Sequence, residues 1–225
     1  MRTAIISDVH ANQVALNAVL GEIDSMGIKQ IISAGDVVGY YPFPNEVIHL
    51  FKERSIVGIA GNHDRTVLRT KVSSMNPIAG EAAQWTAKEL DDSSRNYLAS
   101  LPPRTHIMIG GKLAGLYHGS PRDDVEYVFE EEAEPELLKL SGTRLLILGH
   151  THIPYIYHSR EGTIVNPGSV GQPRDGDPRA CFMVYDSTKD DFTIRRIEYD
   201  IETVIKEISR AGLPKDLGER LRHGW

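Results

Sequence analysis

Short apolar runs alternate with polar turn residues in the first part of the chain. The runs 3–7, 30–34 and 56–60 are rich in isoleucine and alanine, and each is followed by an aspartate or a glycine. Short apolar runs that end in this way are typical of strands buried in a parallel sheet. We therefore expect three parallel strands here.

Helical spacing separates these runs. Apolar residues recur three and four positions apart from Ala15 to Ile23, which predicts a helix that Asn12 caps and Gly27 ends. A second helix is expected to begin at Pro44 and to continue through Phe51. Strand, helix and strand in this order predict βαβ units and an α/β fold.

The rest of the chain changes character twice. Residues 65–104 have helical spacing without a long apolar run, which predicts a helical cap excursion that packs beside the site. Runs 105–109 and 112–118 flank Gly110-Gly111 and predict a hairpin. Beyond them we expect an acidic helical segment at 130–136, a strand at 145–148, shorter antiparallel strands at 155–158, 163–166, 180–186 and 192–199, and helices at 201–210 and 214–222.

Composition restricts the class of protein. The chain has 225 residues, of which 40% are hydrophobic and 25% charged, so we expect one domain over 1–225. The net charge of -6, without a basic run, argues against long nucleic acid as a partner. Cys181 is the only cysteine, so neither a disulfide framework nor a thiolate zinc site is expected. With no apolar run long enough for a signal peptide or a membrane span, we expect a cytoplasmic protein without a membrane partner; a homo-oligomer is compatible with the sequence.

Polar residues that can bind metal follow several of the predicted strands. Because right-handed crossovers bring the carboxyl ends of parallel strands to one sheet edge, these residues can meet although they are far apart in sequence. In an extended segment residues two apart point the same way, so Asp8 with His10 and His150 with His152 can each present two side chains to one place. The candidate ligands are Asp8, His10, Asp36, Asn62, His118, His150 and His152.

The donor types narrow the choice of metal. Carboxylate, amide and imidazole donors without thiolate suit two divalent ions such as manganese, iron, zinc or nickel, and the imidazoles disfavour a site for magnesium alone. Each residue also has a simpler reading: Asp8 can form a turn or cap a helix, Asn62 can occupy a left-handed turn, and His118 can be a hydrogen-bonded core histidine. The joint pattern favours the metal site.

Five short motifs occur in a fixed order between Asp8 and His152. Together they resemble the calcineurin-like metallophosphoesterase superfamily, and a later Asn166-Pro167-Gly168-Ser169 turn resembles its small bacterial and archaeal phosphodiesterase branch. The resemblance implies a four-layer α/β/β/α sandwich of two mixed sheets, with the site at the carboxyl ends of the first three strands. The motifs are Asp8-Val9-His10, Gly35-Asp36-Val37-Val38-Gly39, Gly61-Asn62-His63-Asp64, His118-Gly119 and Gly149-His150-Thr151-His152.

The resemblance also implies roles for these residues. Asp36 would bridge two metals, one bound also by Asp8, His10 and His152 and the other by Asn62, His118 and His150. A hydroxide held between the ions would attack the phosphorus of a small phosphate ester. His63 would protonate the leaving alkoxide, with Asp64 orienting its ring.

One departure from the family pattern affects the expected substrate. Protein phosphatases and dinucleoside tetraphosphatases of this family carry Asp-Arg-Gly after the second motif, whereas Gly39-Tyr40-Tyr41 stands here. A phosphate-binding arginine is therefore missing from its usual place, which favours a phosphodiesterase. Tyr40 and Tyr41 are expected to line the substrate pocket. Phosphate contacts are expected from Asn12, Arg65, Arg122 and Arg174.

Three alternatives remain open. A phosphomonoesterase, including a protein phosphatase, would prefer a monoester to a diester of the same alcohol. A non-catalytic metal-binding scaffold is a second alternative, but the retromer subunit that resembles this fold lacks the histidine equivalent to His63. A nuclease is a third, and the acidic balance of the chain disfavours it.

Overall fold

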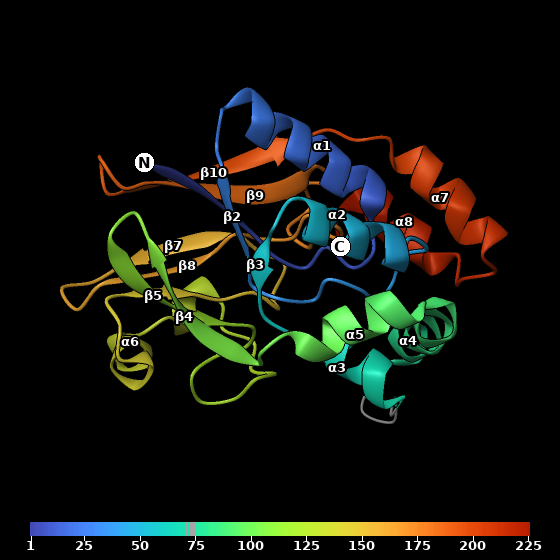
Figure 1. Ribbon diagram of the computed structural model, residues 1–225, viewed down its shortest axis with the longest axis horizontal. Coiled ribbons are helices and arrows are strands. Elements are labelled where there is room, and N and C mark those ends of the chain that lie inside the picture. Colours follow the sequence, from blue (N-terminus) through green and yellow to red (C-terminus); the bar gives the residue numbers. More distant parts are fainter. Residues whose placement is uncertain (71, 73–74) are drawn as a thin grey trace.

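Two five-stranded sheets pack face to face, with helices on their outer faces (Figure 1). The computed structural model describes residues 1–70, 72 and 75–225. Both sheets contain parallel and antiparallel pairs, and helices cover each outer face. The predicted four-layer α/β/β/α sandwich of two mixed sheets is confirmed.

The first sheet has the order β10-β9-β1-β2-β3. Its parallel strands are β1 (Arg2–Ile6), β2 (Gln30–Ser33) and β3 (Val57–Gly58), and its antiparallel strands are β9 (Ala180–Asp186) and β10 (Asp191–Ile197). The third strand is shorter than the predicted run 56–60. The backbone N–H of Ala60 donates to the carbonyl of Pro102 (2.8 Å) instead of pairing with β2, so the chain leaves the sheet early.

The second sheet has the order β4-β5-β6-β8-β7. Its strands are β4 (Arg104–Ile109), β5 (Lys112–Tyr117), β6 (Leu145–Ile147), β7 (Tyr155–His158) and β8 (Thr163–Asn166). Gly110 and Gly111 both have positive φ, which is the geometry of a two-residue hairpin turn and confirms the predicted hairpin. The expectation for 163–166 was incomplete, because β8 is antiparallel to β7 but parallel to β6.

Alternate residues of β1 face different cores. Ile5 belongs to the core between the two sheets, together with Ile32, Leu116 and Ile147. Ala4 and Ile6 face the other way, toward the helices α1 (Gln13–Ser25) and α2 (Pro44–Glu53). Because both faces of β1 are buried, its run of apolar residues is continuous rather than alternating.

The helical excursion begins earlier than the sequence predicted. It consists of α3 (Asn62–Arg69), α4 (Pro77–Glu89) and α5 (Asp92–Ser100), so its first helix starts at Asn62 and not after residue 64. Asn62 opens this helix directly after the Gly61 cap, which places a candidate ligand on the first turn of the helix. Trp85 and Tyr97 pack partly buried against the hydrophobic clusters of this region.

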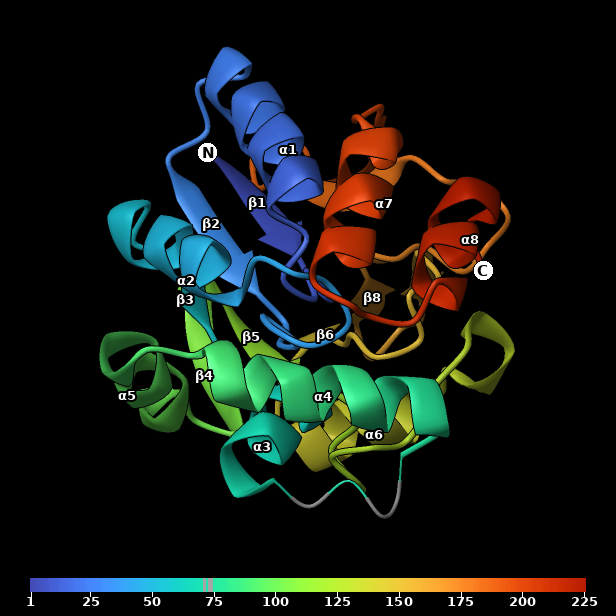
Figure 2. The same cartoon turned by 90° about the vertical axis from the view of Figure 1, so that its right-hand side faces the viewer.

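The remaining helices complete the outer layers. The acidic segment forms a short 3₁₀ helix (Glu130–Glu132) and leads into α6 (Pro135–Ser141), which packs on the outer face of the second sheet. Helix α7 (Ile201–Arg210) lies beside α1, α8 (Asp216–His223) lies on the other side of α7, and α4 runs below them (Figure 2). Among the described residues, no helix has the length and apolar character needed to cross a membrane.

Candidate metal centre

The loops after four strands and the first turn of α3 meet at one end of the sandwich. Asp8 and His10 follow β1, Asp36 follows β2, and Asn62 opens α3. From the second sheet, His118 follows β5 and the pair His150 and His152 follows β6. The structure thus brings all seven predicted ligands together. Three overlapping groups have ligand atoms within 4.8 Å of one another: Asp8, His10 and His152; His10, Asp36 and His63; and Asp36, His118 and His150.

In the first group, three atoms that can bind a metal lie close together. The Nε2 atoms of His10 and His152 lie 3.1 Å apart, and Asp8 Oδ1 lies 3.3 Å from His152 Nε2 and 3.8 Å from His10 Nε2. Asp8 Oδ1 is buried and has no hydrogen-bond partner. A buried carboxylate oxygen is costly unless a partner compensates its charge. This orphaned oxygen therefore fits a cation.

Asp36 lies between the two sides of the centre. Its Oδ2 atom is 3.3 Å from His118 Nε2 and 3.7 Å from His10 Nε2. Asn62 Oδ1 is 2.9 Å from His118 Nε2, which places the amide oxygen on the same side as His118. One carboxylate oxygen is thus near ligands from both groups.

Backbone carbonyls fix the orientation of each imidazole. Nδ1 of His10, His118 and His152 lies 3.3, 2.8 and 2.5 Å from the carbonyls of Val38, Ala34 and Gln172. His150 uses Nε2 instead, 3.1 Å from the carbonyl of Val125. Because a carbonyl only accepts hydrogen bonds, each of these nitrogens carries a proton, so the other nitrogen of each ring is the one that can bind a cation once it is deprotonated.

The carboxylates of the centre are ionised. Burial raises the pKa of Asp8 and of Asp36, but the neighbouring imidazoles of His152 and His118 outweigh burial and hold both pKa values well below the usual range. Asp36 in turn overcomes the effect of burial on His118 and raises its pKa to about 9. The site therefore holds buried negative charge, which a divalent cation would neutralise.

Most of the candidate ligands have a left-handed backbone conformation, which sets the direction of their side chains. This corrects the expectation that Asp8 with His10, and His150 with His152, share a direction because their segments are extended. These turns leave the strand direction immediately, and non-glycine residues in this conformation are costly and concentrate at functional sites. Positive φ occurs at Asp8 (54°), His10 (51°), Asp36 (52°), His150 (69°) and His152 (62°).

The glycine before Asn62 is required by close packing. A Cβ atom at Gly61 would lie 2.0 Å from Asp36 Oδ1. That same oxygen accepts a hydrogen bond from the backbone N–H of His63 (2.8 Å). The start of α3 therefore packs directly against the carboxylate of Asp36, and only a glycine at position 61 permits this contact.

His63 lies beside the centre, but the expected contact with Asp64 is not present. Both oxygens of Asp64 accept backbone hydrogen bonds, from Gly61 (2.9 Å), Val38 (3.0 Å) and Val37 (3.2 Å). Nδ1 of His63 is buried and has no hydrogen-bond partner. Asp64 thus ties the loop after β2 to α3 and orients His63 only through the backbone. Burial lowers the pKa of His63 to about 4.

Two further rings position the His63 side chain. Its centroid lies 4.5 Å from that of Tyr40 and 4.7 Å from that of His10. Tyr40 is itself held by Arg174, whose Nη2 donates to the tyrosine hydroxyl (3.2 Å). A Cβ atom at Gly39 would lie 2.6 Å from His63 Nδ1, so the loop after β2 approaches this ring closely.

Several expected substrate contacts are engaged elsewhere. Asn12 is fully buried, accepts from the backbone N–H of Ala15 and donates to the carbonyl of Gly171, so it caps α1 and is unavailable to substrate. Tyr41 is also fully buried. Arg122 forms ion pairs with Glu126 and Glu134. Arg174 donates to Tyr40 and Gln172, and it supports the cavity wall without lining the cavity.

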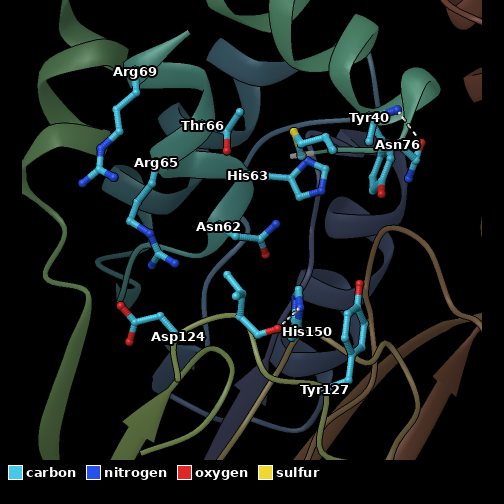
Figure 3. Close-up of a pocket in the computed structure, with 13 residues that line it drawn as sticks. Tyr40, Asn62, His63, Arg65, Thr66, Arg69, Asn76, Asp124, Tyr127 and His150 are labelled. Carbon is cyan, nitrogen blue, oxygen red and sulfur yellow. Dashed lines mark hydrogen bonds between the residues drawn. The ribbon is translucent and has the colours of Figure 1, made fainter. Parts of the chain in front are cut away.

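A cavity of about 720 Å³ opens beside the centre (Figure 3). Tyr40 and Arg65, both expected near substrate, line it together with Asn62, His63 and His150. The sequence analysis missed other lining residues. These are Thr66, Arg69, Met75, Asn76, Ala79, Asp124, Val125 and Tyr127.

Only some of the missed residues carried a usable signal. Arg69 follows Arg65 by four positions, so helical spacing would have paired them had the start of α3 been placed at Asn62. Tyr127 lies with its ring centroid 4.0 Å from that of His150, but its loop has no periodic pattern. Its position depends on a contact between distant segments.

Comparison with known proteins identifies close relatives. The family model described as calcineurin-like phosphoesterase superfamily domain matches residues 1–190. An uncharacterized protein of Methanocaldococcus jannaschii is 36% identical, with 97% of this chain and 96% of the relative aligned. The crystal structure of a metallophosphoesterase from Sphaerobacter thermophilus has 36% identity and a TM-score of 0.86, covering 100% of this chain and 99% of the other. Phosphodiesterase YfcE of Escherichia coli is 24% identical over 82% of this chain and 87% of its own length.

Proposed function

The chain belongs to the calcineurin-like phosphoesterase superfamily and is a phosphoric ester hydrolase, and on this premise we propose that it is a dinuclear-metal phosphodiesterase. The observation that carries the proposal is the buried Asp8 Oδ1, which lacks a hydrogen-bond partner and faces two imidazole nitrogens. Buried polar atoms without partners are rare, and a divalent ion bound here would supply the missing partner.

We assign the ligands as two sets that share Asp36. The first set adds Asp8, His10 and His152, and the second adds Asn62, His118 and His150. Manganese, iron, zinc and nickel suit this mixture of carboxylate, amide and imidazole donors. When bound, two such ions supply Lewis-acid stabilisation of phosphate oxygens and activate water at neutral pH.

His63 is proposed to protonate the leaving alkoxide. It lines the cavity and lies against His10 and Tyr40, so its ring is held at the border between the centre and the space for substrate. Burial lowers its pKa, and the negative charge of a bound phosphate opposes that effect by favouring the imidazolium. Arg174 and Tyr40 serve as positioning residues for this ring.

Three observations favour a diester over a monoester. The cavity extends well past the candidate ligands, so it has room for the second substituent that distinguishes a diester. The relative from Escherichia coli is named a phosphodiesterase. The position after Asp36 that holds an arginine in the phosphatases of this family carries Gly39-Tyr40 instead.

Protein reconstituted separately with each metal tests the activity and the role of His63. We expect faster hydrolysis of the diester than of the monoester of 4-nitrophenol. For His63→Ala we expect turnover to fall about 10²- to 10⁴-fold with an alkyl leaving group, and much less with 4-nitrophenolate, which needs no proton to leave. His106→Ala, at an exposed position of β4, is the matched control and should leave both rates unchanged.

Each alternative predicts a different result. A clear preference for the monoester would identify a phosphomonoesterase. Full metal loading without turnover of either substrate would identify a scaffold. Equal losses for His63→Ala with good and poor leaving groups would remove the acid role from His63 and leave the diesterase activity in place.

A further inference from the structure

One side of the cavity is cationic although the protein as a whole is acidic. Arg65 and Arg69 lie along it, and Tyr40 and Tyr127 lie on the other side (Figure 3). Within the described residues, neither arginine has a carboxylate oxygen within 4.0 Å. The chain carries a net charge of -6, so two guanidinium groups without a carboxylate partner in one cavity call for an explanation.

Helix α3 fixes where these two groups lie relative to the centre. Asn62 stands on its first turn and contacts His118, while Arg65 and Arg69 follow three and seven residues later. With a rise of about 1.5 Å per residue, their backbone positions lie about 4.5 Å and about 10 Å beyond Asn62 along the helix axis. A ligand that extends from the centre through the cavity therefore meets the two arginines in succession.

Arg65 is held in place, with donors to spare. Its Nη1 donates to the carbonyl of Ala60 (2.9 Å), and the side chain is half-buried. A guanidinium has five N–H donors in a planar fork, so most of them remain free for an anion. Arg69 is exposed at the far end of the cavity and can close on a ligand from there.

The residues that face the two arginines leave this part of the cavity positively charged. Among the described residues that line the cavity, Asp124 is the only one with a carboxylate, and it faces Arg65 in Figure 3 without forming an ion pair. Two guanidinium groups against one carboxylate leave an excess of positive charge. Phosphate matches the guanidinium fork in a bidentate way, whereas a neutral substituent would leave it unpaired.

We propose that Arg65 and Arg69 form a second phosphate subsite, which selects phosphodiesters whose leaving alcohol carries a phosphate monoester of its own. This inference rests on the proposed diesterase function. The leaving alcohol is the relevant half of the substrate because His63, the proposed acid, lines the same cavity as the two arginines. A small substrate such as a terminally phosphorylated dinucleotide has this chemistry and fits a cavity of about 720 Å³.

Matched dinucleotides test the subsite in the metal-reconstituted enzyme. Dithymidine monophosphate and its 3′-phosphorylated form share one diester and differ only in a second phosphate. This phosphate lies on the nucleoside that leaves as its 5′-alcohol when hydroxide attacks phosphorus, the P–O5′ bond breaks and His63 donates the proton. We expect kcat/KM to be about 10- to 100-fold higher for the phosphorylated form, the range of a charge-assisted contact. Arg65→Gln and Arg69→Gln should each lower kcat/KM for the phosphorylated form more than for the unphosphorylated form, and so remove most of this preference.

Two further variants sharpen the test. Asp124→Asn removes the one carboxylate of the cavity and should increase the preference, the opposite of the arginine variants. Arg210→Gln, on the exposed end of α7, is the matched control and should have no effect. Calorimetric binding of thymidine 3′,5′-bisphosphate and thymidine 5′-monophosphate gives a readout that is independent of turnover, and the bisphosphate should bind more tightly only when both arginines are present.

The outcomes separate the two proposals. Hydrolysis of both dinucleotides at equal kcat/KM, or a preference that survives in both arginine variants, would overturn the subsite and leave the diesterase intact. Absence of turnover on both dinucleotides and on aryl diesters would overturn the diesterase itself, and the subsite as a selector of substrate with it.

Discussion

Asp36 occupies the position from which one carboxylate reaches both groups of candidate ligands. Its Oδ2 lies 3.3 Å from His118 Nε2 and 3.7 Å from His10 Nε2, and its Oδ1 is held by the backbone of His63. The neighbouring imidazoles keep its pKa well below the usual range despite burial. A single ionised carboxylate in this position is suited to bridge two cations.

Substitution of Asp36 should therefore affect both ions, whereas Asn62 should affect one. We expect Asp36→Ala to reduce bound metal from two ions per chain toward none, and Asn62→Ala to leave one ion bound. The loss of metal affinity should be larger than about 10- to 100-fold, the loss that is typical when a residue hydrogen-bonded to a metal ligand is removed. Metal content after dialysis, measured by mass spectrometry, checks this. Asp124→Asn controls for loss of cavity charge, and retention of one ion at unchanged affinity in Asp36→Ala would contradict a bridging role.

At the scale of single elements, the sequence predicted the strands well and the turns after them poorly. Runs of buried isoleucine and alanine identify β1 and β2 because burial on both faces leaves a continuous apolar signal. The left-handed residues Asp8 and His10 left no such signal, since local sequence favours extended or helical backbone for both. That the ligands meet could be inferred from topology, but their directions could not.

Asp64 illustrates an element-scale role that the sequence obscured. The family resemblance implied that it orients His63, yet its two oxygens accept from three backbone N–H groups and join the loop after β2 to α3. No sequence pattern marks this contact, because Val37 and Val38 contribute only backbone atoms. The loop that carries Asp36 and the helix that carries Asn62 are thereby fixed relative to each other.

Loss of the junction that Asp64 forms between the loop after β2 and α3 should lower the free energy of unfolding. In Asp64→Asn one acceptor oxygen is replaced by an amide group that cannot accept, which leaves at least one buried N–H unpaired at a cost of about 1–3 kcal/mol. Thermal unfolding of the metal-free protein should show a lower Tm. Asp92→Asn, at an exposed position on the first turn of α5, should change stability by less than about 0.5 kcal/mol. Equal Tm values for the two variants would show that the junction contributes nothing.

At the scale of the whole molecule, the centre joins the two sheets at one end. Asp8 and Asp36 come from loops of the first sheet, and His118 and His150 come from loops of the second. Direct contacts already cross this boundary: His118 Nδ1 donates to the carbonyl of Ala34 (2.8 Å), and the backbone N–H of His150 donates to Asp8 Oδ2 (3.1 Å). The continuous hydrophobic core between the sheets does not depend on the ligands.

Metal removal should therefore loosen the protein locally without unfolding it. Ions that bind only the folded chain add about 2.7 kcal/mol of stability at a free concentration of 100 times Kd. For a domain of this size this raises Tm by about 5–10 °C. We expect the chelated protein to stay folded, because Ile5, Ile32 and Leu116 still hold the sheets together, with a lower Tm and faster amide exchange confined to the ligand loops. Asp36→Ala lacks the shared ligand, so its Tm should be low whether or not metal is added. Two results would contradict the idea that the ions join two sheets already held by their core. These are a metal-dependent rise of Tm in Asp36→Ala and global unfolding of the chelated wild type.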